Sequence, residues 1–137
     1  MSGYRRSFPT RWNDNDVYGH INNAVYYQAM DTTINNWLIE VGGLDIEHGD
    51  ILGVCAGSGC QYRASASYPD SLALDLTVAR LGTTSVTWTV RIAREQDDLE
   101  LAIGEFVHVF IDREHRRPVA LPVGLRDAIT ANLEVAR

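Results

Sequence analysis

The spacing of apolar residues predicts one long helix in the first third of the chain. From Tyr26 to Val41, apolar side chains recur every three or four residues, as on one face of an α-helix. We predict a helix over residues 22–41, capped by Asn22 and ended by Gly42-Gly43. Much of its polar side carries Asn and Thr rather than charged residues. We therefore expect this helix to be buried on most sides.

After residue 50 the apolar positions alternate, which is typical of strands with one buried face. The alternating apolar residues are Leu72, Leu74, Leu76 and Val78, followed by Val86, Trp88, Val90 and Ile92. Two longer strands are predicted over residues 51–66 and 99–112, and a short strand over residues 4–11. Turn residues separate the four later strands, so we predict that these strands form an antiparallel meander.

These elements together predict an α+β fold in which an antiparallel sheet curls around the long helix. A short amphipathic helix is expected over residues 123–136. The other face of the sheet also carries apolar residues, which favours a partner subunit. The 137 residues contain no linker or repeat, so we expect one domain over residues 1–137.

Composition narrows the choice of partners and location. The formal net charge of −6 argues against nucleic acid as the main partner, because phosphate neutralisation needs clustered positive charge. All 12 basic residues are Arg, which leaves room for a local phosphate site. The N-terminus has no apolar signal core, and no apolar run reaches about 18 residues. We therefore expect a cytoplasmic protein without a membrane partner.

The two cysteines are predicted to be small core residues. Cys55 and Cys60 are five residues apart in a predicted strand, which would place them on opposite faces. That placement argues against a disulfide between them and against a shared metal ion. Burial is the usual fate of an unpaired cysteine.

Polar groups are concentrated directly before the long helix, in the segment WNDNDVYGHINN (residues 12–23). This segment resembles the signature of hotdog-fold acyl-CoA thioesterases of the 4-hydroxybenzoyl-CoA thioesterase type. The pattern is Asp-x-Asp-x-x-Gly-His-x-Asn-Asn, filled here by Asp14, Asp16, Gly19, His20, Asn22 and Asn23. The later strands are similar to those of the same family, so the resemblance covers nearly the whole chain.

This resemblance implies a hotdog fold, with a five-stranded antiparallel sheet wrapped around one central helix. It also implies a homodimer or homotetramer with its active sites at the subunit interface. The expected substrate is a thioester of coenzyme A or of an acyl carrier protein, and the expected reaction is hydrolysis. The family resemblance implies no metal and no cofactor.

The resemblance assigns the chemistry to three residues. Asp16 would attack the thioester carbonyl directly or deprotonate a water molecule. The backbone N–H of Asn23, at the positive end of the helix, would stabilise the oxyanion. His20 either assists proton transfer or forms a hydrogen bond that fixes the loop. Asp14 is expected to serve the turn rather than the reaction.

Five further residues are predicted to position the substrate. Gly19 would let the loop turn tightly, and Asn22 begins the helix where the carbonyl must sit. Arg63, Thr84 and Ser85 would supply contacts from the partner subunit to the pantetheine arm and phosphates. Two other functions stay open at this point: an acyl-thioester hydratase or dehydratase, and a non-catalytic acyl-CoA-binding protein.

Overall fold

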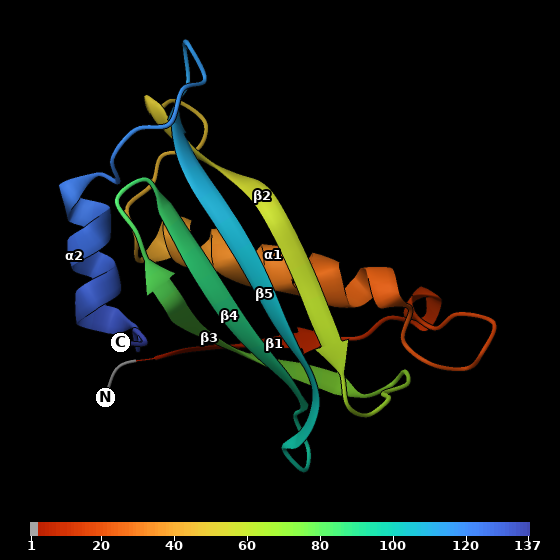
Figure 1. Cartoon of the computed structure of the whole chain (residues 1–137). Coiled ribbons are helices and arrows are strands. Elements are labelled where there is room, and N and C mark those ends of the chain that lie inside the picture. The colour runs from red at the N-terminus through yellow and green to blue at the C-terminus, as the bar shows by residue number, and fades with distance from the viewer. Residues whose placement is uncertain (1–2) are drawn as a thin grey trace.

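The computed structural model describes residues 3–137, in which a curved sheet wraps one long helix (Figure 1). The strands are β1 (Tyr4–Pro9), β2 (Ile51–Tyr62), β3 (Ser71–Leu81), β4 (Ser85–Arg94) and β5 (Leu99–Asp112). The helices are the short 3-10 turn η1 (Trp12–Asp14), the central α1 (Asn23–Glu40) and α2 (Val123–Asn132) near the C-terminus. None of these helices is long and apolar enough to cross a membrane.

The five strands form one antiparallel sheet in the order β1-β3-β4-β5-β2. This arrangement confirms the predicted α+β fold, with its five-stranded sheet around a central helix. The predicted meander holds only for β3, β4 and β5, because β2 pairs with β5 rather than with β3. The connection over residues 63–70 is too long for a tight turn. It carries the chain from one edge of the sheet to a strand near the other.

The core lies between α1 and the concave face of the sheet. The alternating residues predicted for β3 and β4 are all buried there, and the helix buries Ala29, Met30, Ile34, Trp37 and Leu38 against them. Trp37 and Trp88 meet at the centre, with ring centroids 5.7 Å apart. Each large apolar side chain buried in this way contributes about 1.5–3 kcal/mol to folding.

The helix approaches β5 closely at one glycine. A Cβ atom added to Gly104 would overlap the Met30 sulfur, so no larger residue fits there unless Met30 moves. Gly104 is therefore part of the packing between α1 and the sheet.

The edge strand β2 contains a bulge that changes the predicted placement of the cysteines. Cys55 lies opposite His108 and Cys60 lies opposite Gly104, with one extra residue inserted between Cys55 and Gly57. His108 and Gly104 are an even number apart on a regular strand, so both cysteines lie on the same face. The opposite-face prediction is wrong for this reason. Both thiols are free, and Cys55 is exposed rather than in the core.

The ends of three other elements also differ from the prediction. β1 ends at Pro9, two residues before its predicted end. β2 leaves the ladder at Tyr62, four residues before its predicted end, because the chain then turns into the connection. α2 stops at Asn132 because Val135 forms a parallel bridge to Val78 on β3. The predicted limits of α1 are confirmed, with Asn22 capping its first turn.

Candidate active site

The motif loop before α1 is folded by its own backbone hydrogen bonds. The Asp16 N–H donates to the His20 carbonyl at 2.9 Å, and the Gly19 N–H donates to the Asp16 carbonyl at 3.1 Å. Gly19 has a φ of +83°, a conformation that favours glycine. The expected turn at Gly19 is therefore present, and it keeps residues 16–20 in a tight loop.

A second segment, the connection over residues 63–70, holds this loop in place. The Ile21 N–H donates to the Ala66 carbonyl at 2.9 Å, and the Ser67 hydroxyl donates to the Gly19 carbonyl at 3.0 Å. The Asn15 side-chain oxygen accepts a hydrogen bond of 3.0 Å from the Tyr68 N–H. Two loops far apart in the sequence thus form one rim of the site.

The two carboxylates of the motif have different surroundings. Asp14 is 1% exposed, and it accepts hydrogen bonds from the Arg11 N–H at 2.8 Å and from the Arg11 guanidinium at 2.9 Å. It is therefore a structural residue of the turn, as predicted. Asp16 is half-buried, and one of its oxygens accepts a 2.9 Å hydrogen bond from the Tyr18 N–H. No residue within 3–137 donates a hydrogen bond to its other oxygen.

The start of α1 leaves one backbone donor open. The Asn22 side chain accepts from the Ala24 N–H at 3.0 Å, and the Asn22 carbonyl accepts from the Val25 N–H at 2.9 Å. The Asn23 N–H, the first of the helix, has no acceptor among residues 3–137. This donor lies at the positive end of an 18-residue helix.

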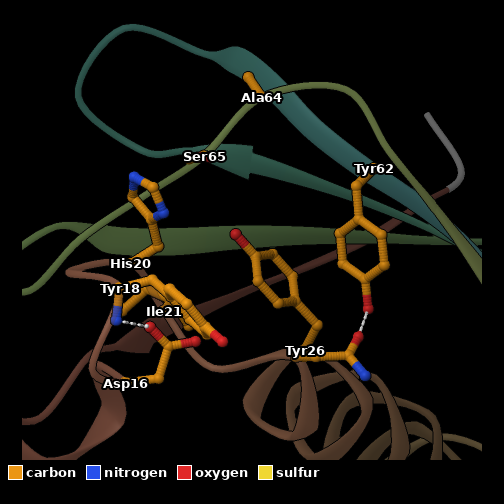
Figure 2. Close-up of a pocket in the computed structure, with 9 residues that line it drawn as sticks. Asp16, Tyr18, His20, Ile21, Tyr26, Tyr62, Ala64 and Ser65 are labelled. Atoms are coloured by element: carbon orange, nitrogen blue, oxygen red, sulfur yellow. Dashed lines mark hydrogen bonds between the residues drawn. The ribbon is translucent and has the colours of Figure 1, made fainter.

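An open cleft of about 550 Å³ brings the motif residues together (Figure 2). It is lined by Asp16, Tyr18, His20, Ile21, Asn23, Tyr26, Tyr62, Ala64 and Ser65. All three predicted catalytic residues thus share one cleft. A carboxylate, an imidazole and a free helix amide in such a cleft can activate a nucleophile and stabilise an oxyanion.

His20 lies in the cleft, with its ring pointing away from the Asp16 carboxylate (Figure 2). Its imidazole has no hydrogen-bond partner within the described part of the chain. The bond that closes the loop comes from its backbone carbonyl instead. The expected side-chain bond from His20 is therefore not formed here.

Comparison with known proteins identifies the family. The sequence pattern of the thioesterase-like superfamily matches residues 10–132. The chain belongs to the thioesterase-like superfamily. This membership confirms the predicted thioester hydrolase in general terms. No curated protein matches the sequence.

Solved structures of similar proteins agree with this placement in the superfamily. The PA5185 protein from Pseudomonas aeruginosa strain PAO1 is 43% identical, with a TM-score of 0.92 over 99% of this chain and 95% of that one. The PA2801 protein from the same species is 27% identical, with a TM-score of 0.86 over 94% of this chain and 99% of that one. A 1,4-dihydroxy-2-naphthoyl-CoA thioesterase from Synechocystis has the same fold at 20% identity and a TM-score of 0.84, over 93% of this chain and 96% of that one.

Three of the predicted substrate contacts lie outside the cleft of this thioesterase-like chain. The Arg63 guanidinium pairs with Glu100 at 3.0 Å, beside a separate pocket on the sheet. Thr84 and Ser85 lie at the β3–β4 turn, at the end of the sheet that also carries the start of β2. A single protomer therefore does not direct these three side chains into the cleft.

Another pocket, of about 540 Å³, lies next to the β3–β4 turn. Arg80 and Arg126 line it, and the Arg126 guanidinium donates to the Gly82 carbonyl. The turn itself contains no basic residue. The positive charge of this pocket comes from the end of β3 and from α2, and only the folded chain brings these two side chains together.

Tyr62 also lines the cleft, although no local pattern in the sequence predicted it. Tyr62 is the last residue of β2, and its hydroxyl donates to the Asn23 side-chain oxygen. Tyr26, predicted as core, is buried and also lines the cleft. Among residues 3–137, no group of three or more His, Cys, Asp and Glu side chains could hold a metal ion.

Proposed function

We propose that this protein hydrolyses a coenzyme A thioester, with Asp16 as the catalytic carboxylate and the Asn23 N–H as the oxyanion donor. The observation that carries the proposal is that Asp16 and Asn23 line the same cleft. Among residues 3–137, one Asp16 oxygen accepts no hydrogen bond and the Asn23 N–H has no acceptor. A carboxylate and an unpaired helix donor are the two groups that thioester hydrolysis requires.

Two routes use these groups. In the first, Asp16 takes a proton from water, the hydroxide attacks the carbonyl carbon, and the thiolate leaves and takes up a proton. In the second, the Asp16 carboxylate attacks the carbonyl carbon and expels the thiolate. Water then hydrolyses the mixed anhydride to the free acid and the restored carboxylate.

Both routes place negative charge on the thioester oxygen. The Asn23 N–H can donate a hydrogen bond to that negatively charged oxygen. The next two amides of the helix are already bonded to the Asn22 side chain and the Asn22 carbonyl. A preorganised donor of this kind lowers the barrier by about 2.7–4 kcal/mol. In this proposal His20 remains a residue of the cleft that assists proton transfer.

The free edge of β2 supports a homodimer. Its 12 residues carry no charge and pair with β5 on one side only. The opposite edge, β1, is short and carries Arg5 and Arg6, which discourage strand pairing. We infer that two copies pair antiparallel along β2.

A two-fold axis perpendicular to this edge would complete the active site. It would bring the end of β2, at Tyr62, beside the start of the partner's β2. In each protomer the β3–β4 turn lies at that starting end. The Gly19 loop and the Asn22 cap would hold the thioester in one subunit. Thr84 and Ser85 are proposed to contact the pantetheine arm from the other subunit. Arg63 follows the end of β2, so in this dimer it stays on the side of its own subunit's site and the predicted contact from the partner is not proposed for it.

Coenzyme A is the proposed thiol because the Arg80–Arg126 pocket next to this turn offers two guanidiniums for its phosphates. Two proteins of the same fold have names that mention this thiol. One is the 1,4-dihydroxy-2-naphthoyl-CoA thioesterase from Synechocystis, and the other is the SAV2348 protein from Staphylococcus aureus, in complex with CoA.

The test is an acyl-CoA panel in which released thiol is measured for wild type and Asp16→Asn. We expect turnover to fall by about 10²- to 10⁴-fold, because the variant keeps the shape of the side chain but loses its basicity. Asp127→Asn, an exposed residue of α2, is the matched control and should behave as wild type. Full turnover by folded Asp16→Asn would remove Asp16 from the chemistry. Tight binding without turnover by wild type would favour an acyl-CoA-binding protein.

A further inference from the structure

Tyr62 closes one end of the cleft and connects the sheet to the helix (Figure 2). Its side chain lies on the helix-facing side of β2, because it is opposite the buried Ala102. The hydroxyl donates to the side-chain oxygen of Asn23, the first residue of α1. This one bond therefore joins β2 to the residue whose N–H is the proposed oxyanion donor.

Tyr26 provides a second ring beside the first. The two ring centroids are 5.2 Å apart and the ring planes are 83° apart, an edge-to-face contact. Tyr26 is buried, whereas Tyr62 is 47% exposed, so the outer ring is the one that a ligand meets. Together the rings form an aromatic wall across the cleft.

Behind this wall the helix-facing side of β2 carries only small side chains until Ile51, at the far end of the strand. By the register of the bulged strand, these residues are Gly53, Cys55, Ser58 and Cys60. Tyr62 is thus the one large side chain on this side of β2 between Gly53 and the end of the strand.

We propose that Tyr62 is the residue that limits the acyl group, admitting short aliphatic or single-ring acyl groups and excluding long chains. Through its hydroxyl it also positions Asn23 for the reaction. The inference rests on the proposed thioesterase function and adds the substrate class to it. The Tyr62 ring limits the size of the acyl group, whereas the Tyr62 hydroxyl positions Asn23. Removing the whole side chain or only the hydroxyl therefore tests these two roles separately.

The hydroxyl acts as a donor throughout the working pH range. Burial raises the pKa of Tyr62, with smaller contributions from the neighbouring Cys60 thiol. The phenol therefore remains protonated, and Tyr62→Phe removes the donor while leaving the wall in place.

The experiment measures kcat and KM for acetyl-, butyryl-, benzoyl-, octanoyl- and palmitoyl-CoA with wild type, Tyr62→Ala and Tyr62→Phe. We expect wild type to prefer the compact substrates. Tyr62→Ala should raise the octanoyl-to-butyryl ratio of kcat/KM by about tenfold or more, because methylenes then enter the space of the lost ring. Tyr62→Phe should keep the wild-type ratio and lower kcat by about two- to tenfold through the loss of one hydrogen bond. Tyr4→Phe on β1 is the matched control and should change neither quantity.

Two results would show that Tyr62 does not limit the acyl group. One is an unchanged octanoyl-to-butyryl ratio of kcat/KM in Tyr62→Ala, and the other is equal kcat/KM of wild type for butyryl-CoA and palmitoyl-CoA. An unchanged kcat in Tyr62→Phe would overturn the positioning role. If Tyr62→Ala does not fold, Tyr62→Leu opens less space and should shift the ratio in the same direction by a smaller factor.

Calorimetric titration with non-hydrolysable butyryl- and octanoyl-CoA thioethers separates this proposal from the proposed reaction. Absence of turnover on every substrate would count against the thioesterase alone. The ratio of the affinities for the two thioethers, compared between wild type and Tyr62→Ala, would still test whether Tyr62 limits the length of the acyl group.

Discussion

His108 is a buried histidine without a hydrogen-bond partner for one ring nitrogen. It lies on β5, is 2% exposed, and its Nδ1 atom has no partner in the described residues. Its ring meets the edge of Trp88 at a centroid distance of 6.2 Å. Burial lowers the pKa of His108, and the Asp31 carboxylate opposes that effect only in part. The folded protein therefore holds this imidazole neutral.

This burial predicts a loss of stability in acid. The unfolded chain protonates His108 near pH 6.5, whereas the folded chain does so only at lower pH. Stability from the neutral form is complete above about pH 6.5 and is lost as the pH falls below it. One such group changes stability by at most about 1.4 kcal/mol per pH unit. We expect the free energy of unfolding, measured with urea, to fall less between pH 7.5 and pH 5.0 for His108→Phe than for wild type.

The control for this measurement is His115→Phe, which changes an exposed histidine in the turn after β5. It should lose as much stability between the two pH values as wild type does. If His108→Phe behaves in the same way, the acid sensitivity arises elsewhere.

At the residue scale, the sequence predicted those site residues that are close together in the chain. Asp16 and Asn23 lie seven positions apart, and the motif together with the start of the helix placed both in the cleft. Tyr62 reaches the same cleft from a strand 39 positions after Asn23. No local pattern links those two residues, because their contact exists only after β2 packs beside α1.

At the scale of elements, the contact of α1 with β5 depends on the missing side chain of Gly104. Gly104→Ala should destabilise the fold by about 1–3 kcal/mol, because the added methyl group overlaps Met30. Denaturant unfolding would measure this loss. In a double-mutant cycle, Met30→Val should recover part of it by shortening the opposing side chain.

Gly59→Ala on the neighbouring strand is the matched control. A Cβ atom there meets nothing within 4 Å, so this substitution should cost little. Equal stability of Gly104→Ala and wild type would show that Met30 moves aside without loss.

The limits of an element were predictable where the signal that ends it is local. Asn22 and the glycines after Val41 define α1 in the sequence and in the structure. The bulge in β2 has no such signal, because Val54 to Gly59 contains only small residues that fit a regular strand as well. The end of α2 was missed because it depends on a bridge to β3, a contact from elsewhere in the fold.

At the scale of the whole molecule, strand order could not be read from the alternation of residues. Alternation tells which side of a strand is buried, but not which strand is its neighbour. The connection over residues 63–70 carries the chain from β2, beside β5, to β3 near the other edge of the sheet. A segment of this length is compatible with several strand orders.

The proposed dimer gives a prediction at this scale. Ala56→Lys places a charge on the exposed edge of β2 and should yield a monomer of about 15.3 kDa in sedimentation experiments. Turnover should fall with the fraction of dimer, because each site would lose the contacts from its partner. Ala131→Lys, the same change on the exposed side of α2, should leave the dimer intact. A dimeric and active Ala56→Lys protein would place the interface elsewhere.

The hydrogen bonds between the motif loop and residues 63–70 have a consequence for heating. Both segments are irregular surface chain, and regions of this kind open at a lower free energy than the core. Asp16 would leave its place as soon as they separate, while the strands and α1 are still folded. We therefore expect activity to be lost at a lower temperature than that at which the sheet unfolds, and to return when the protein is cooled before that point.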